Sequence, residues 1–523
     1  MRLITSLIFG IIALSFTSAQ LSKKQLQDKW FVEGQARMNG YSKTKLLDTG
    51  GKRVILAIGD GMSLTTVTTA RILQGQQKGK TGEEEQLSWE KFPFTGLSKT
   101  YNVDYQVPDS AGTATAFLCG VKTDAGIIGL DENSVRGDCA ASKGTEVGSI
   151  LKLAKQAGLS VGIVVTARIT HATPSSSYAH CPERNWEGSV PSLAEQQGCI
   201  DIAQQFINFQ KEHGGISVAL GGGRRNFIPN TQNDVEYPNT KGRRVDGKDL
   251  IQEWKNLQLQ NSAYVWNLSD FNAIDPKKTD HLFGLFEPSH MQYESARNKG
   301  PSGEPSISEM TRKAIQILER NPKGYFLLIE SGRIDHGHHE GSAYKALTEA
   351  VALAQAVETA DKLTNENETL IIVTSDHGHT MSMSGYPKRG NPIFGLTGAL
   401  GNYGKPSLTL NYANGPGAWK DGDPRPNLTG VDTAHPKFLQ QAITKLNSET
   451  HDGTDVAIYA RGPFSHLYVG VVEQNYIFHP MAKALCLDPS KAGQQTCSNS
   501  AHGVNVSILA LLTTLMAIVL QFI

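Results

Sequence analysis

The sequence predicts an α/β protein, a three-layer sandwich in which helices flank a large, mostly parallel central sheet and a small lobe is inserted. Three observations predict it. Short runs rich in Val, Ile and Leu recur along the chain, segments with helical periodicity separate them, and one Gly-, Pro- and Asn-rich stretch interrupts the alternation. Such apolar runs are typical of buried parallel strands. Their alternation with helices is typical of an open α/β sheet.

Four apolar runs lead to side chains that can bind a metal ion. They are residues 53–61 with Asp60, 160–173 with His171 and Thr173, 324–332 with Glu330, and 369–379 with Asp376 and His377. Ligands of open α/β sheets bind beyond the carboxyl ends of the strands. We therefore expect these side chains to meet in one site. A solvated turn explains any one strand end equally well, but it is a weak explanation for all four.

Helices are expected at 146–158 and 342–363, where apolar residues in the second segment recur three and four apart. Residues 385–449 have little helical periodicity, and we expect an inserted loop or small β-rich lobe there. Strand-like alternation returns at 454–466. No internal repeat or low-complexity linker divides the chain, so one domain is expected over residues 20–499.

Both ends of the chain carry targeting patterns. Residues 1–19 are typical of a secretory signal peptide cleaved after Ala19, since the apolar run is short for a membrane helix. Residues 500–523 are typical of a GPI-anchor signal that is removed, with Asn499 as the anchor residue and Ser500 as the near alternative. A retained membrane helix is the other alternative, but no Lys or Arg follows the tail. The expected location is the extracellular face of the plasma membrane.

The charge balance argues against nucleic acid as a partner. Lys and Arg total 50, Asp and Glu total 50, and no basic stripe stands out. A secreted chain permits disulfides, and the plausible close pairs are Cys139 with Cys199 and Cys486 with Cys497, although spacing alone does not fix connectivity. We expect Cys119 to be a buried free thiol, while Cys181 is either free or paired with Cys119.

Sequons stand at Asn267, Asn367 and Asn427, and they fit an exposed, glycosylated surface. A fourth, at Asn505, lies in the tail that is expected to be removed.

Two clusters favour zinc and one favours a harder ion. Asp335 and His339 lie four apart, so a helical turn places a carboxylate and an imidazole on one face. Asp376 and His377 are adjacent, and both can serve one metal only if the strand breaks, which Gly378 permits.

His451 stands alone in the sequence, so its role as a metal ligand is suggested only by the other clusters. His338 is not expected to bind a metal. Asp60, Thr173 and Glu330 are all oxygen donors, which suit Mg²⁺.

Ser110 is the candidate nucleophile. It follows Asp109 at the head of a run of small residues that leaves room for a substrate. A neutral serine hydroxyl is a weak nucleophile, but two zinc ions roughly 4 Å apart can hold its alkoxide and clamp a phosphoryl group. If a helix begins at Ser110, the free backbone N–H groups of its first turn would also favour a bound anion. The guanidinium of Arg184 can grip two phosphate oxygens, although a surface salt bridge is the commoner role of an arginine.

Taken in order, these motifs resemble the animal alkaline phosphatases. They are GDGM, PDSAGTAT, RITHATP, RNW, RIDHGHHE, SDHGH and ETHDG, and they span nearly the whole chain. The resemblance implies a phosphoserine at Ser110 and a phosphate clamp at Arg184. It implies one zinc ion on Asp335, His339 and His451, a second on Asp60, Asp376 and His377, and magnesium on Asp60, Thr173 and Glu330. His171 and His336 match positions near the magnesium and the substrate.

The animal members also have a calcium site, which the resemblance carries to Glu236, the Phe286 carbonyl, Glu287 and, with an altered local spacing, Glu304. Residues 385–449 resemble the crown lobe that joins two subunits, so a homodimer is implied. The expected cofactors are two Zn²⁺, one Mg²⁺ and one Ca²⁺ per chain.

The function expected from the sequence is hydrolysis of phosphate monoesters outside the cell. Two alternatives stay open at this point: a phosphodiesterase or sulfatase on a related scaffold, and a non-catalytic surface receptor. Arg184 favours monoesters, because a diester has fewer free oxygens to grip. The complete ligand set around Ser110 argues against a receptor.

Overall fold

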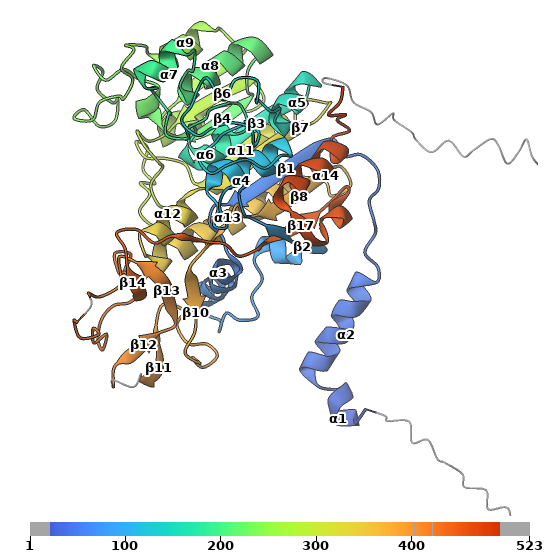
Figure 1. Ribbon diagram of the computed structural model, residues 1–523. Helices are drawn as coiled ribbons and strands as arrows, with labels where there is room; N and C mark the ends of the chain where they lie inside the picture. The colour runs from blue at the N-terminus through green and yellow to red at the C-terminus, as the bar shows by residue number, and fades with distance from the viewer. Residues whose placement is uncertain (1–20, 401–403, 421, 492–523) are drawn as a thin grey trace, which may run out of the picture. The chain divides into compact units, whose positions relative to one another are not determined.

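The computed structural model describes residues 21–400, 404–420 and 422–491 (Figure 1). The signal peptide, Asn499 and Cys497 therefore lie outside the described residues. The chain divides into a unit over Met1–Lys45 and a compact unit from Leu46 onward. The first contains α1 (Lys23–Leu26) and α2 (Lys29–Tyr41), whose first turns are capped by Ser22 and Asp28. Within the described ranges, every helix is too short or too polar to cross a bilayer.

The second unit is built on a ten-stranded sheet in the order β17-β2-β16-β8-β1-β7-β3-β4-β6-β5 (Figure 1). Its strands are β1 (Arg53–Gly59), β2 (Phe94–Lys99), β3 (Ser160–Arg168), β4 (Val218–Gly222), β5 (Ser262–Val265), β6 (His281–Leu285), β7 (Tyr325–Ser331), β8 (Thr369–Thr374), β16 (Val456–Arg461) and β17 (Gly470–Glu473). Only β16 pairs antiparallel with its neighbours. The predicted mostly parallel sheet is confirmed, and so are strands at the four predicted apolar runs.

Helices cover both faces of the sheet, because each central strand is apolar on both sides. In β1, Val54, Leu56 and Ile58 pack into one core and Ile55 and Ala57 into the other. The first core takes in α4 (Ser110–Cys119), α5 (Ile150–Gln156), α8 (Ile202–His213), α9 (Leu250–Asn256) and α14 (Phe478–Ala484). The second takes in α3 (Leu64–Gln77), α10 (Leu268–Ala273), α11 (Ile307–Leu318) and α13 (Ala343–Leu363). This is the predicted three-layer arrangement.

Short helices occupy the connections around the sheet. They are α6 (Ala172–Ser175), α7 (Ser192–Gln196), α12 (Arg333–His339), η1 (Ser88–Lys91), η2 (Arg224–Asn226), η3 (Ser465–Tyr468) and η4 (Gln474–Ile477).

The stretch 385–449 holds small sheets apart from the central one. The strands β13 (Leu410–Gly415) and β14 (Ala442–Lys445) form one of them together with β10 (Met381–Met383), which directly precedes the stretch, and β11 (Leu396–Leu400) pairs with β12 (Pro406–Leu408) in another. Directly beside this stretch in sequence, β9 (Gly378–His379) pairs antiparallel with β15 (His451–Asp452). That last pairing brings the C-terminal part of the chain back to the strand ends.

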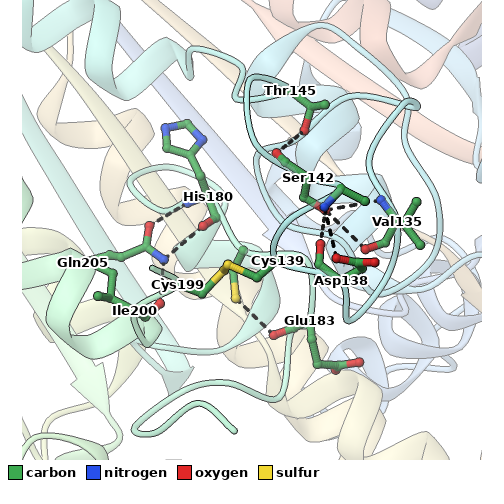
Figure 2. The surroundings of a disulfide bond; sticks show 12 residues. Val135, Asp138, Cys139, Ser142, Thr145, His180, Glu183, Cys199, Ile200 and Gln205 are labelled. Atoms are coloured by element: carbon green, nitrogen blue, oxygen red, sulfur yellow. Dashed lines mark hydrogen bonds between the residues drawn. A yellow bond between two sulfur atoms is a disulfide. The ribbon is translucent and has the colours of Figure 1, made fainter. Parts of the chain in front are cut away.

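A disulfide joins Cys139 and Cys199, with their Cα atoms 5.9 Å apart (Figure 2), as expected. Beside it, the Gln205 side chain accepts from the backbone N–H of His180 at 2.8 Å and donates to its carbonyl at 3.0 Å. Cys119 and Cys181 are both buried free thiols, so the alternative in which they pair is not formed. Burial raises the pKa of each of these two thiols to about 12, which keeps them protonated and unreactive.

Replacing Cys139 and Cys199 together by serine should lower the free energy of unfolding by about 2–4 kcal/mol, because the bond closes a 60-residue span in the unfolded chain. The midpoint of guanidinium unfolding measures the loss. An unchanged midpoint would contradict the expected contribution.

The sequon at Asn267 departs from the expected exposed surface. Its side chain is buried and caps α10, accepting from the Asp270 N–H at 2.8 Å and donating to the Asp270 carboxylate at 2.9 Å. Both polar atoms are therefore occupied. Asn367 and Asn427 are exposed, as expected.

Candidate functional site

The four strands β8, β1, β7 and β3 are adjacent and parallel, so their carboxyl ends meet at one edge. Asp60 directly follows β1, and Glu330 is the penultimate residue of β7. Asp376 and His377 follow β8, and His171 and Thr173 follow β3. The structure thus brings the polar residues of all four strand ends to one place.

Asp335, His339 and His451 form the first group. Asp335 Oδ1 lies 3.2 Å from His339 Nε2 and 3.2 Å from His451 Nε2, and the two nitrogens are 3.1 Å apart. Ligand atoms about 2.1 Å from one zinc ion in tetrahedral geometry are about 3.4 Å from each other. The triangle is therefore close to the size that a zinc ion requires.

Backbone carbonyls orient both imidazoles of this group. His339 Nδ1 lies 2.5 Å from the Glu449 carbonyl, and His451 Nδ1 lies 2.8 Å from the Pro108 carbonyl. A carbonyl only accepts, so each Nδ1 carries a proton, and a bound cation would take the lone pair of each Nε2. A hydrogen bond from the remote nitrogen is the usual support of a metal-binding histidine.

His379 completes this group but was not predicted. Its Nε2 lies 2.8 Å from Asp335 Oδ1, and its Nδ1 lies 2.5 Å from Glu449 Oε2. Burial opposes its charge, but Glu449 and Asp335 outweigh that effect and raise the pKa of His379 to about 10. The ring is therefore an imidazolium that donates to both carboxylates, and it orients Asp335 without offering a lone pair to a metal.

Asp60, Asp376 and His377 form the second group. His377 Nε2 lies 3.2 Å from Asp376 Oδ2 and 3.6 Å from Asp60 Oδ1. The Ser110 hydroxyl lies 3.2 Å from the same nitrogen, which is close to the spacing of two ligands of one zinc ion. The strand break that allows this comes before Gly378, since β8 ends at Thr374. Gly378 is instead needed for space, because a Cβ there would lie 2.5 Å from Asp452 Oδ1.

Asp60, Glu330 and Thr173 form an oxygen-only group. Both carboxylate oxygens of Asp60 and of Glu330, and the Thr173 hydroxyl, are buried without a hydrogen-bond partner. Buried carboxylates without partners are strongly unfavourable. Burial first, and then repulsion from neighbouring carboxylates, raises the pKa of Asp60 well above its ordinary value. The donor set fits a hard cation such as Mg²⁺.

Magnesium binding to the metal-free protein should release protons. Burial raises the pKa of Glu330 to about 8, so its carboxyl is protonated at neutral pH and must lose that proton to bind a cation. The dissociation constant for Mg²⁺ should fall by about tenfold per pH unit between roughly pH 6 and 8 for each proton displaced. Calorimetry in two buffers of different ionisation enthalpy counts the protons, and a pH-independent affinity would contradict the assignment.

Ser110 is the first residue of α4, as the sequence suggested. The Asp109 carboxylate caps this helix by accepting from the Gly112 N–H at 3.1 Å. The small residues after Ser110 are needed because the helix is entirely buried. A Cβ at Gly112 would lie 2.6 Å from the Asn102 amide nitrogen, and that amide donates to Asp109 at 3.1 Å.

Arg184 is held near Ser110 by a hydrogen bond to Asp109, the residue that precedes Ser110. Its Nη1 donates to Asp109 Oδ2 at 2.9 Å, so the carboxylate that caps α4 also orients the guanidinium. Arg184 Nη2 lies 3.4 Å from His171 Nε2. The guanidinium is thereby held next to the nucleophile candidate, at the N-terminus of a helix, where an anion is favoured.

Other histidines divide into two kinds. His338 is fully buried between the Thr66 hydroxyl at 3.0 Å and the Tyr412 hydroxyl at 2.8 Å, which agrees with its expected role as a bystander. His171 and His336 lie together with a third residue, His290, within 4.8 Å. His290 was not predicted, because it follows a different strand, β6.

Three carboxylates expected to bind calcium, those of Glu304, Glu287 and Glu236, lie near enough to interact electrostatically. Glu304 Oε2 is buried without a partner, and burial followed by repulsion from Glu287 raises the pKa of Glu304 to about 9. Glu287 accepts from Tyr237 and from Gln292, each at 3.0 Å. Glu236 pairs with Arg224 at 3.0 Å. Carboxylates gathered in this way fit a cation with many oxygen ligands.

Comparisons with known proteins agree on one family. The family model described as alkaline phosphatase matches residues 51–487. Tissue-nonspecific alkaline phosphatase from Gallus gallus is 48% identical over 496 residues, which cover 93% of this chain and 94% of the relative. The Homo sapiens protein of that name is 46% identical over 486 residues, covering 91% and 92%. The crystal structure of Thermus thermophilus alkaline phosphatase matches with a TM-score of 0.61 at 23% identity, covering 90% of this chain and 96% of that one, and supports the fold.

Proposed function

Because the chain belongs to the alkaline phosphatase family and is a phosphate monoester hydrolase, we propose that it works through a phosphoserine at Ser110 beside three cations. The observation that carries this proposal is the 3.2 Å contact between the Ser110 hydroxyl and His377 Nε2. It sets one hydroxyl beside a group of buried, unpaired carboxylate oxygens.

One zinc ion would be held by Asp335, His339 and His451, and a second by Asp60, Asp376 and His377. Magnesium would be held by Asp60, Thr173 and Glu330. The fit rests on the unpartnered oxygens and on the spacing of the imidazole nitrogens. When bound, the ions would lower the pKa of the serine hydroxyl and of a water molecule and would neutralise the charge of the phosphoryl group.

The chain's own residues supply attack, orientation and charge. Ser110 Oγ attacks phosphorus in line with the leaving alcohol, and the Ser110–phosphate ester is later cleaved by water, which regenerates the hydroxyl. Arg184 donates to two non-reacting phosphate oxygens, and Asp109 holds the guanidinium for this task. These contacts hold the phosphoryl group in line and stabilise the charge that is spread over its three equatorial oxygens in the transition state.

Hydrolysis of a chromogenic phosphate monoester and of a matched methyl diester tests the proposal. We expect kcat/KM for the monoester to exceed that for the diester by at least about a thousandfold, because a methyl group in the diester blocks one of the three free oxygens that Arg184 and the cations would bind. Comparable rates would favour the phosphodiesterase alternative. A protein that retains full zinc but hydrolyses neither ester would favour a receptor.

Arg184→Ala should lower kcat/KM for a phosphate monoester by about a hundredfold or more, because one preorganised donor pair is lost. Arg184→Lys should retain only part of the wild-type kcat/KM, since an ammonium group cannot bind two oxygens in a fixed bidentate geometry. The inhibition constant of inorganic phosphate should rise in both variants. Unchanged phosphate inhibition would show that Arg184 does not touch the phosphoryl group.

We also propose a calcium ion on Glu236, the Phe286 carbonyl, Glu287 and Glu304, supported by the buried, unpartnered Oε2 of Glu304 beside the Glu287 carboxylate. Homodimerisation through residues 385–449 and GPI anchoring at Asn499 on the outer face of the plasma membrane remain predictions from the sequence. Sedimentation velocity tests the first. Release from cells by phosphatidylinositol-specific phospholipase C tests the second.

A further inference from the structure

Glu449 is the last residue of the stretch 385–449, and it lies where the three-stranded sheet of β10, β13 and β14 meets the first metal group. Its side chain is only 1% exposed. In the described part of the chain, no Lys or Arg lies within 4.0 Å of its carboxylate, and its charged partner is His379. Burying a carboxylate is costly unless it is paired. Since Glu449 is not placed among the metal ligands, its burial calls for another role.

One oxygen of Glu449 reaches Asp335 through His379. Glu449 Oε2 lies 2.5 Å from His379 Nδ1, and His379 Nε2 lies 2.8 Å from Asp335 Oδ1. The ring between them has little room to move. A Cβ at Gly61 would lie 2.5 Å from it, and the His338 ring stacks on it with centroids 4.7 Å apart. A displacement of Glu449 is therefore passed on to the Asp335 carboxylate.

The backbone of Glu449 holds a second member of the first group. Its carbonyl accepts from His339 Nδ1 at 2.5 Å, and its N–H donates to the His339 carbonyl at 2.9 Å. Both the ring and the main chain of His339 are thus tied to Glu449. His451, the third member, follows two residues later in β15. One short segment therefore positions all three donors of the first group.

The three-stranded sheet in turn holds Glu449. The other carboxylate oxygen, Oε1, accepts from the Thr380 N–H at 2.8 Å and from the Thr380 hydroxyl at 2.6 Å. Thr380 directly precedes β10, and its carbonyl accepts from the Ala413 N–H of β13 at 3.3 Å. Gly415, the last residue of β13, leaves room for Glu449, because a Cβ there would lie 3.0 Å from Glu449 Cβ. The position of the carboxylate is therefore set by β10 and β13.

We propose that Glu449 is a positioning residue through which the three-stranded sheet holds the first zinc ion in place. The inference rests on the proposed function, which assigns that ion to Asp335, His339 and His451. Groups that orient metal ligands typically contribute about 10–100-fold to metal affinity or activity. The hydrogen bonds of Glu449 described above all lead to the first group or to the sheet, so the effect should be confined to one of the two zinc ions.

The test follows the transfer of zinc from the metal-loaded enzyme to a chromogenic chelator over time. Glu449→Ala should release one of the two zinc ions about 10–100-fold faster than the wild type does. The other ion should leave no faster, because loss of a neighbouring cation lessens the repulsion on the ion that stays. A general loosening of the fold would instead free both ions alike. Anomalous diffraction from crystals soaked in the chelator identifies the site that is emptied first.

Two milder variants and one control complete the series. Glu449→Gln keeps the shape and one oxygen acceptor, so its rate of zinc release should lie between those of Glu449→Ala and the wild type. Thr380→Val removes one donor to Glu449 and should accelerate release of the same ion by about threefold or more. Glu90→Ala removes the same atoms from a carboxylate that accepts from Arg71 at 2.7 Å and from the Leu87 N–H at 2.9 Å. It should release zinc as the wild type does.

Unchanged zinc release in Glu449→Ala, or equal acceleration of both ions, would overturn the inference. If Glu449→Ala does not fold, Thr380→Val decides, and a wild-type rate in that variant would overturn it as well. Failure of the proposed function looks different, because the wild-type protein itself would then bind no zinc or would leave phosphate monoesters intact.

Discussion

Ser110→Ala is expected to lower kcat/KM for a phosphate monoester by at least about a thousandfold while the protein stays folded. The hydroxyl is the only group of the second metal group that is proposed to form a bond to phosphorus, so its loss removes the two-step route. Zinc content should stay at wild-type level, because the carboxylate and imidazole donors remain. Steady-state kinetics and elemental analysis on the same preparation measure both.

A matched control is Ser176→Ala, which removes the same atoms from a buried serine. The Ser176 hydroxyl donates to the Ala172 carbonyl at 2.9 Å and belongs to none of the three proposed cation groups. It should retain turnover within about threefold. A Ser110→Ala enzyme with full zinc and near-normal turnover would refute the nucleophile assignment.

Asp60→Asn is the second change with a very large expected effect, because Asp60 is the one carboxylate shared by two cation groups. The variant should lose the magnesium and the zinc of the second group but keep the zinc on Asp335, His339 and His451. Activity should fall by at least about a thousandfold. Elemental analysis after dialysis against a weak chelator gives the metal content.

Without metal ions, by contrast, the Asp60→Asn substitution should not destabilise the protein. Burial and repulsion raise the pKa of Asp60 in the folded state, so ionising it weakens the metal-free fold as the pH rises toward that pKa. Metal-free Asp60→Asn should therefore melt no lower than metal-free wild type at about pH 8. Exposed Asp423→Asn serves as the control. A large destabilisation of the metal-free variant would mean that Asp60 has a structural role.

The sheet and most of the site could be predicted because their signals are local. The runs 53–59 and 369–374 are apolar on both faces, so burial forces them into the middle of the sheet. The rule that parallel strands share one functional edge then placed Asp60 and Asp376 together. The pairing of Asp335 with His339 could be predicted because the two residues lie one turn apart in a single short helix, α12.

The residues that were missed depend on contacts between distant segments. His379 and Glu449 meet because the two-residue strands β9 and β15 pair, and neither strand is long enough to be recognised by periodicity. His290 follows β6, which is two strands away from β3 in the sheet. The sequon at Asn267 is a three-residue pattern, whereas its burial is set by the packing of α10.

The most direct test of the central claim is anomalous diffraction at the zinc absorption edge from crystals of the protein. The account predicts one zinc peak bounded by Asp335, His339 and His451 and a second bounded by Asp60, Asp376 and His377, with Ser110 Oγ at the open side of the second. A zinc peak ligated by His379, or a second peak with Ser110 turned away from it, would contradict the account.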